Sequence, residues 1–297
     1  MIYQKTLSNT LYLSGREGYG GNLVQVELHP AEPGTGILFQ TSYGDVPARL
    51  EHAFSSRRSI LLQKGSAQVI HAEHLLATLF AYGVNNACVS LKREPTLSYS
   101  LLKRVGLATD IEVVPFFSQL ERTVCDAIEK TGLEEQGKPL TYLKPDGLIC
   151  DKKLSFSPIP HPSLIIKATT RYPLPGEQSR EVTITSQNYK DSIAPSRALV
   201  YVPSWLPKFV ASTLMTCIYP SFGIGHGFTD KNVFYLSSNP LQWSTVIYHT
   251  IMDRLGAIAL LDGRLNYTKI YIQFSNHAHD LDFLKKHQSR FERTTLD

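Results

Sequence analysis

The sequence predicts an α+β protein made of two related halves, each with a β-sheet and helices packed on it. Two observations predict this class. Strand-like segments come in runs, and each half contains an apolar helix followed by a turn and another strand. These helix–strand pieces, residues 71–91 and 240–274, share one plan although their detailed sequences differ. A parallel doubly wound sheet is disfavoured because it needs strands that alternate with helices.

The first half begins with strands and loops. The alternating run NLVQVELHP is typical of a strand, AEPGTG is typical of a loop, and Lys64-Gly65 favours a hairpin turn. Gly83 is a natural helix stop after the apolar segment that begins at His71. The predicted elements are strands within 1–50, a hairpin over 57–70, a helix over 71–82, a strand over 87–92 and a helix over 116–130.

The boundary between the halves is predicted at the polar stretch GLEEQGKP, residues 132–139, which we interpret as a linker. A length of 297 residues favours two domains. We therefore expect an N-terminal domain over 1–133 and a C-terminal domain over 134–297.

The second half is predicted to open with strands and to contain one long helix. Asn239 is a good N-cap residue, Pro240 suits the first helical position, and helical periodicity continues to Leu261 before Asp262-Gly263. The predicted strands are 140–145, 147–151, 153–159, 163–173, 180–186 and 269–274.

Composition and charge exclude several classes of protein. The formal charge is only +4 and no dense Lys/Arg run occurs, so we expect no nucleic-acid partner. No segment approaches the roughly 18 apolar residues of a spanning helix, and the N-terminus lacks the pattern of a signal peptide. We expect a soluble cytoplasmic protein without an integral membrane segment. No GxGxxG or GxxxxGK[ST] motif follows a strand, which disfavours nucleotide-binding folds of those types.

The cysteines indicate a reducing compartment. They are far apart and form no CxxC pair, which argues against a thiolate zinc finger and against a disulfide scaffold. The four are Cys88, Cys125, Cys150 and Cys217.

His249 and Asp253 are the first candidate metal ligands. Their i, i+4 spacing in the motif HTIMD puts both side chains on one helix face, close enough to chelate one ion. His and Asp are both good zinc ligands, and three protein ligands plus a water are typical of a catalytic zinc site. The alternative is an exposed helix pair that contributes about 0.2–0.5 kcal/mol.

Glu73 and His74 open the first helix. Adjacent helical residues point about 100° apart, so we expect that they cannot both face the core. If His74 is a third ligand, the neighbouring Glu73 can act as a general base toward a zinc-bound water. The alternative is a glutamate favoured by the helix dipole beside a structurally satisfied histidine.

A third group of polar residues follows the last predicted strand. His277 and His279 precede a helix, where a loop-borne acid is commonly found. Asp280 and Asp282 could orient such a histidine and raise its pKa. A solvated polar loop is the alternative.

Several segments, in one order along the chain, resemble the LpxC family of zinc-dependent UDP-3-O-acyl-N-acetylglucosamine deacetylases of lipid A synthesis. The most specific is AEHLLATLFAYGVNNACVSL, similar to the family's V-E-H-L-L-x-A-x-x-G-L-G-I-D-N-x-x-V-E-L. HTIMDRLG is similar to H-K-x-L-D-A-I-G, and SNHAHDLDFL to S-G-H-A-L-N-N-x-L-L. The remaining matches are QKTL, LHPAEPGTGILF and SRA (196–198).

The resemblance implies two β/α sandwich domains with the active site at their junction. It implies that His74, His249 and Asp253 bind zinc and that Glu73 is the general base. It also implies that His277 assists the tetrahedral intermediate or the leaving amine. The substrate would be a small N-acetylated sugar, which can carry an acyl chain, and the reaction would release acetate.

The resemblance also suggests substrate contacts. Its M-D-G-S-A-x-P-F motif corresponds to TDIEVVPF and so to Asp110, and S-R-A-R-T-F corresponds to Arg197, Val200 and Tyr201. The apolar segment between Val200 and Leu236 would form a hydrophobic passage for the acyl chain; ordinary core is the alternative.

Some family positions differ in this chain. The Lys after the helix His is Thr250, the second Asp of that helix is Ala257, and the Thr of S-R-A-R-T-F is Val200. His71 stands where the family has Ser or Thr, and we do not expect it to be a ligand.

Three hypotheses follow. The first is a zinc deacetylase acting on the lipid A precursor. The second is a diverged metal-dependent amidase acting on another N-acyl substrate, which the changes at Thr250, Ala257 and Val200 favour. The third is a catalytically silent metal-binding protein, which the retained Glu73 disfavours. Iron(II) would suit two His and one carboxylate nearly as well as zinc.

Overall fold

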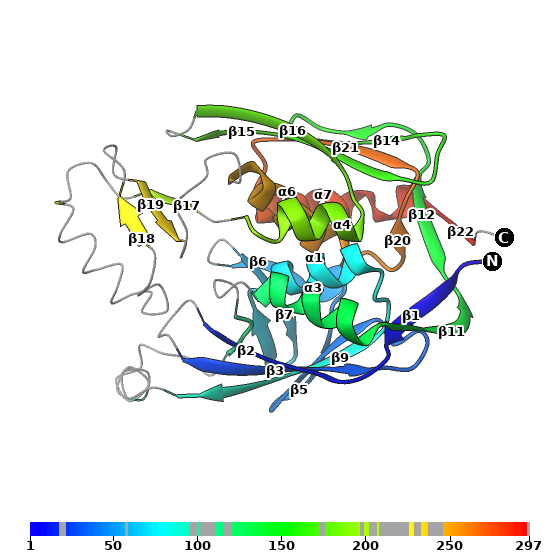
Figure 1. Ribbon diagram of the computed structural model, residues 1–297. Coiled ribbons are helices and arrows are strands. Elements are labelled where there is room, and N and C mark those ends of the chain that lie inside the picture. Colours follow the sequence, from blue (N-terminus) through cyan, green and yellow to red (C-terminus); the bar gives the residue numbers. More distant parts are fainter. Residues whose placement is uncertain are drawn as a thin grey trace.

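The computed structural model describes most of the chain. The ranges covered are 1–17, 22–56, 59–95, 100, 111–115, 120–172, 176–196, 199–201, 207, 226–228, 233–236 and 246–295. Figure 1 shows the helices as a middle layer, with the sheet that contains β14, β15 and β16 on one side and the sheet that contains β2, β3 and β9 on the other. The α+β class predicted from the sequence is confirmed.

Within the described residues, the first half contributes strands to three sheets and carries two long helices. Its helices are α1 (Glu73–Tyr82) and α3 (Leu120–Thr131), with a 3-10 turn at Leu50–His52. Its strands are β1 (Tyr3–Leu7), β2 (Leu11–Arg16), β3 (Leu23–Pro30), β4 (Ile37–Thr41), β5 (Gly44–Pro47), β6 (Ala53–Ser56), β7 (Ser59–Lys64), β8 (Ala67–Ile70), β9 (Ala87–Glu94) and β10 (Glu112–Val113).

The second half carries the helices α4 (Ser186–Asn188), α6 (Val246–Ile258) and α7 (His277–His287), a π-helical turn at Tyr189–Ile193 and a 3-10 turn at Gln288–Arg290. Its strands are β11 (Leu133–Pro139), β12 (Thr141–Pro145), β13 (Ile149–Cys150), β14 (Leu154–Pro158), β15 (Leu164–Tyr172), β16 (Gly176–Thr183), β17 (Leu199–Tyr201), β18 (His226–Phe228), β19 (Val233–Leu236), β20 (Arg264–Leu265), β21 (Thr268–Gln273) and β22 (Phe291–Thr295).

The two halves repeat one sheet topology. The sheet order is β2-β3-β9-β4-β5 in the first half and β13-β14-β21-β15-β16 in the second. In both sheets the strand that comes last in the chain lies in the middle, antiparallel to one neighbour and parallel to the other. In both, a long helix precedes that middle strand: α1 comes directly before β9, and α6 comes before β21 with only the two-residue strand β20 between them. The prediction of two related halves is therefore supported by the strand order as well as by the sequence pattern.

Helix α1 begins and ends where its backbone geometry requires. His71 has a φ of +63°, in the left-handed region, so the helix cannot extend back to it and begins at Glu73, two residues later than predicted. At the other end Gly83 adopts a φ of +77° and its N–H donates to the carbonyl of Phe80 at 3.1 Å. The predicted helix stop at Gly83 is confirmed.

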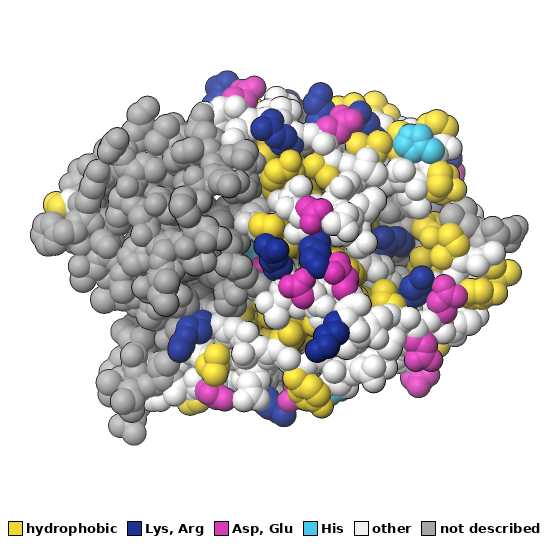
Figure 2. All heavy atoms as spheres, in the orientation of Figure 1, with side chains coloured by type: hydrophobic (Ala, Val, Ile, Leu, Met, Phe, Trp, Pro, Cys, Tyr) yellow, Lys and Arg dark blue, Asp and Glu magenta, His cyan; other side chains and the backbone are white. Residues whose placement is uncertain are grey.

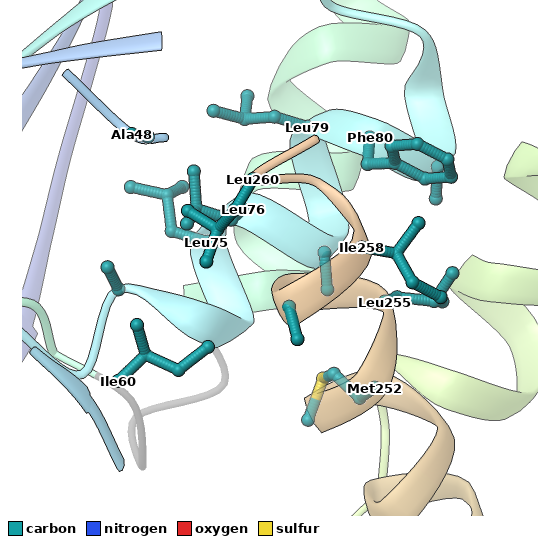
Figure 3. Packing of buried hydrophobic residues seen from close by; sticks show 14 of the residues in the cluster. Ala48, Ile60, Leu75, Leu76, Leu79, Phe80, Met252, Leu255, Ile258 and Leu260 are labelled. Atoms are coloured by element: carbon teal, nitrogen blue, oxygen red, sulfur yellow. The ribbon is translucent and has the colours of Figure 1, made fainter. Parts of the chain in front are cut away.

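Helices α1 and α6 pack closely and join the halves. Figure 3 shows α1, which carries Leu75, Leu76 and Leu79, next to α6, which carries Leu255 and Ile258. All five side chains are buried and belong to one hydrophobic cluster that contains residues of both halves. The cluster removes much apolar surface from water and so contributes strongly to the stability of the junction.

A glycine permits this close approach. A Cβ atom placed on Gly256 of α6 would lie 2.3 Å from the backbone oxygen of Glu73, at the start of α1. Only a residue without a side chain fits there. The start of α1 therefore lies against α6, about one turn from Asp253 and two turns from His249.

The prediction that residues 132–139 form a linker is wrong. Residues 133–139 form strand β11, which pairs antiparallel with β1, with Leu7 opposite Leu133. Its polar composition reflects exposure, because most of its side chains face solvent. The residue after it, Leu140, donates its N–H to the carbonyl of Ile2 at 2.8 Å. The pairing with the N-terminal segment therefore continues one residue past β11.

The other predicted helices agree with the structure where it describes them. Helix α3 ends at Thr131, one residue beyond the prediction, and α6 ends at Ile258, three residues before it. The predicted helix starts at residues 116 and 239–240 lie outside the described residues. Among the described residues, no helix is both long and apolar enough to cross a bilayer. Figure 2 shows basic and acidic side chains interspersed on the described part of one face, as the small net charge suggests.

Candidate metal centre

His74 is held between two carboxylates. It is the second residue of α1 and only 4% exposed. Its Nδ1 lies 2.8 Å from Oε1 of Glu121 in α3, and its Nε2 lies 3.3 Å from Oδ1 of Asp253 in α6. Since Glu121 is an acceptor, it favours the proton on Nδ1 and leaves Nε2 to face Asp253.

His249 and Asp253 lie on one face of α6, as their spacing predicted. Nε2 of His249 is 3.6 Å from Oδ1 of Asp253, and the His249 ring stands edge-on to that of His74 with centroids 4.9 Å apart. One potential ligand atom from each of the three residues lies within 4.8 Å of the other two. Two imidazole nitrogens and one carboxylate oxygen around one point are a donor set that zinc or iron(II) accepts, so the residues fit a metal ion.

The protonation of the candidate ligands follows from their burial and neighbours. Burial lowers the pKa of His249 to about 4, which leaves a neutral imidazole able to coordinate. Burial alone would raise the pKa of Asp253, but the neighbouring His249 and His277 and the hydrogen bond with His74 lower it below its ordinary value. Asp253 is therefore ionised at neutral pH.

Glu73 is buried and fixed by two donors. Its Oε2 accepts hydrogen bonds from Oγ of Ser59 and from the backbone N–H of Ile60, each at 3.0 Å. Its Oε1 lies 3.9 Å from Nδ1 of His71. Burial raises the pKa of Glu73, but His71 and the other nearby imidazoles outweigh it and lower the pKa to about 2. The side chain is therefore a carboxylate that can accept a proton.

The expectation that Glu73 and His74 cannot both face the core is wrong. Both are buried, with exposed fractions of 3% and 4%. Helix α1 lies between strands of the first half and helix α6, and nine of its ten residues are buried. Two side chains about 100° apart therefore both enter protein, Glu73 against β7 and His74 between α3 and α6.

His277 reaches the site and His279 does not. His277 is the first residue of α7 and is buried, with Nε2 3.7 Å from Oδ2 of Asp253. His279 lies nearer the surface: its Nε2 is 2.8 Å from Oδ2 of Asp151, and its Nδ1 is 3.0 Å from Oγ of Ser275. Of the two histidines noted in the sequence, only His277 lies next to a candidate metal ligand.

Two further charged residues, Arg254 and Asp280, lie beside the site. Nη1 of Arg254 lies 3.5 Å from Oδ2 of Asp253, and Nε lies 3.0 Å from Oδ2 of Asp280. Burial raises the pKa of Asp280, and Arg254 offsets part of that rise. Asp282 is exposed. The sequence did not indicate Glu121 or Arg254; the one available signal was a second charged residue, Arg254, next to Asp253 in a largely apolar helix.

The structure describes only some of the residues that are predicted to contact the substrate. Asp110 and Arg197 lie outside the described residues. Val200 and Tyr201 belong to β17, whose backbone pairs with β19, with Val200 opposite Phe234. Most of the apolar segment 200–236 also lies outside the described residues.

The sequence of this chain is similar to those of known deacetylases over most of its length. A family model described as LpxC, UDP-3-O-acyl N-acetylglycosamine deacetylase, matches residues 4–288. The chain is 25% identical over 297 residues to the UDP-3-O-acyl-N-acetylglucosamine deacetylase of Chlamydia pneumoniae. The matched region covers 95% of this chain and 96% of the relative. It is also 25% identical to the deacetylase of the same name from Geobacter sp. (strain M21), which covers 95% of this chain and 87% of the relative.

Proposed function

Because the chain belongs to the LpxC family of deacetylases, we propose that it hydrolyses the N-acetyl amide of UDP-3-O-acyl-N-acetylglucosamine in a zinc-dependent reaction. The observation that carries the proposal is the convergence of His74, His249 and Asp253 beside the carboxylate of Glu73 and the imidazole of His277. Such a set of donors, base and acid is what amide hydrolysis requires.

The metal would be held by His74, His249 and Asp253. Zinc bound there would polarise the amide carbonyl and lower the pKa of a water molecule toward neutrality. Glu121 would keep His74 in the tautomer that directs Nε2 to the metal. Iron(II) is the second candidate ion, since the same donors suit it.

Glu73 would be the general base. It is ionised, and two hydrogen bonds to Oε2 fix the direction of its carboxylate, while Oε1 lies 3.9 Å from Nδ1 of His71. The carboxylate would take one proton from the attacking water as the new C–O bond forms.

His277 would act on the leaving group. Its Nε2 lies on the Oδ2 side of Asp253, away from the oxygen that faces His74 and His249. In its cationic form the imidazole would stabilise the developing negative charge and donate a proton to the amine nitrogen as the C–N bond breaks. The products would be acetate and the free amine of the glucosamine.

Substrate contacts are proposed from the family pattern. Asp110, Arg197, Val200 and Tyr201 would contact the sugar nucleotide or its carbonyl, and the apolar segment between Val200 and Leu236 would receive an acyl chain.

A diverged substrate is the second candidate function. Ala257 is buried at 1% exposure in α6, and Thr250 is also buried at the position of the family's lysine. Neither can supply the charge that the family pattern has there. These changes favour an enzyme that retains the hydrolytic groups and acts on another N-acylated sugar.

The test is acetate release by the zinc-loaded protein from UDP-3-O-acyl-N-acetylglucosamine. Glu73→Gln should lower kcat by about 10²–10⁴-fold, because the amide cannot take a proton, while one zinc per chain is retained. Glu51→Gln, at an exposed glutamate, is the matched control. Unchanged turnover in Glu73→Gln would exclude Glu73 as the base. A wild-type protein that holds zinc without turnover would favour the second candidate, to be examined with other N-acyl sugars.

A further inference from the structure

Arg254 and Asp280 form a buried ion pair between α6 and α7. Their exposed fractions are 5% and 2%, and Nε of Arg254 lies 3.0 Å from Oδ2 of Asp280. Removing two charges from water is expensive, and apolar residues of similar volume commonly replace such a pair without loss of stability. A buried pair next to a candidate metal site therefore calls for a role other than stability.

The guanidinium of Arg254 also reaches a metal ligand. Nη1 lies 3.5 Å from Oδ2 of Asp253, so one side chain bridges two carboxylates on two helices. The two oxygens of Asp253 consequently have different surroundings. Oδ1 faces Nε2 of His74 and of His249 at 3.3 and 3.6 Å, whereas Oδ2 faces Arg254 and His277.

The other end of the bridge is tied to the first turn of α7. Oγ of Ser275 donates a hydrogen bond to Oδ1 of Asp280 and lies 3.0 Å from Nδ1 of His279. Oδ1 of Asn276 accepts the N–H of His279 at 3.0 Å and caps the helix. His277 lies within this turn. The ion pair thus connects the segment that carries His277 to the helix that carries Asp253.

We propose that Arg254 and Asp280 are positioning residues: Arg254 holds Oδ2 of Asp253 so that Oδ1 alone is offered to the metal, and Asp280 fixes the start of α7 to the same guanidinium. The effect on His277 rests on the proposed function; the effect on Asp253 does not. A planar guanidinium suits this bridge because Nε and Nη1 hold fixed positions on one rigid group and face the two carboxylates separately.

The test uses a charge-free double variant of the full-length protein, Arg254→Met with Asp280→Leu, loaded with Co²⁺. The matched control is Arg290→Met with Asp146→Leu, which removes an ion pair at the surface, with an N–O distance of 2.6 Å. The absorption of bound Co²⁺ reports the number and geometry of its ligands and needs no substrate. Affinity for Co²⁺ and Zn²⁺, melting temperature, kcat and KM complete the measurements.

If the proposal is right, the double variant stays folded but its Co²⁺ spectrum changes and its metal affinity falls by about 10- to 100-fold. Its kcat falls while KM changes little, and the control resembles wild type in every respect. A folded double variant with the wild-type spectrum, metal affinity and kcat would overturn the proposal and leave the pair with a purely structural role.

A second pair of variants covers the case in which the double variant does not fold. Arg254→Lys keeps the charge and Asp280→Asn keeps a hydrogen-bonding group of the same size. Both should fold with an altered Co²⁺ spectrum, and a wild-type spectrum in both would contradict the proposal. Failure of the proposed function is recognised separately, because wild-type protein would then bind metal with the same spectral dependence on Arg254 while releasing no acetate.

Discussion

A single buried glutamate contacts one nitrogen of His74, and the other nitrogen faces the candidate metal site. Glu121 comes from α3, is 4% exposed, and lies 2.8 Å from Nδ1 of His74. Hydrogen-bond partners of this kind orient an imidazole ligand and increase its basicity. The chemistry of the site therefore depends on a residue that does not itself belong to the ligand set.

Replacing that glutamate should weaken metal binding. We expect Glu121→Gln to lower zinc affinity by about 10- to 100-fold, because the amide is a weaker acceptor and can present its NH₂ group to Nδ1. Isothermal titration of the metal-free protein with zinc measures the effect. Glu134→Gln, at an exposed position of β11, should bind zinc as wild type does. Equal affinity in the two variants would show that Glu121 does not support the ligand.

At the scale of elements, the contact between α1 and α6 builds the site. Glu73 and His74 open one helix, His249 and Asp253 lie on the other, and Gly256 lets the two backbones meet. Because the two helices come from different halves, neither half alone has the three candidate ligands. The distance between the helices should therefore affect metal binding as well as packing.

A methyl group at the crossing should disturb both packing and metal binding. Gly256→Ala places a Cβ 2.3 Å from the backbone oxygen of Glu73, so the helices must separate. We expect the free energy of unfolding to fall by about 1–3 kcal/mol and the affinity for zinc to fall as well. Gly147→Ala is the control, since its Cβ would meet nothing closer than 3.9 Å and should be tolerated. Denaturant unfolding and zinc titration measure both; a Gly256→Ala protein with wild-type affinity would contradict the expectation.

At the scale of the whole molecule, the halves share a core and a sheet. One hydrophobic cluster contains Leu76 of α1 and Leu255 of α6, and β1 pairs with β11 across the predicted domain boundary. The boundary between residues 133 and 134 remains a prediction, because strand pairing across it does not define where a domain begins. The two ends of the chain also meet the same segment, since Ile2 bonds to Leu140 and Thr295 pairs with Thr141.

Metal removal should therefore affect both halves together. The candidate ligands come from α1 and α6, so an ion bound by them would stabilise the folded protein by about 4 kcal/mol when its concentration is a thousand times its Kd. We expect one calorimetric transition in zinc-loaded protein, which moves as a whole to lower temperature after chelation and returns when zinc is added back. Two transitions of which only one moved would contradict this expectation.

The sequence by itself determined the properties that depend on local periodicity. The i, i+4 spacing placed His249 and Asp253 on one helix face, Gly83 ended α1, and Lys64-Gly65 turned a hairpin. The repeated helix–strand plan also predicted the two related halves, because a buried helix and the strand after it leave a pattern that survives change in individual residues.

Only the tertiary structure decided which distant groups meet. Burial of both Glu73 and His74 requires protein on two sides of α1, and the partners Glu121, Arg254 and Asp280 are brought in by helices separated in the chain. The polar stretch 133–139 became a strand only because β1 supplied an edge with which to pair. Local preferences specify helices, strands and turns; long-range packing and hydrogen bonding specify which of their faces come together.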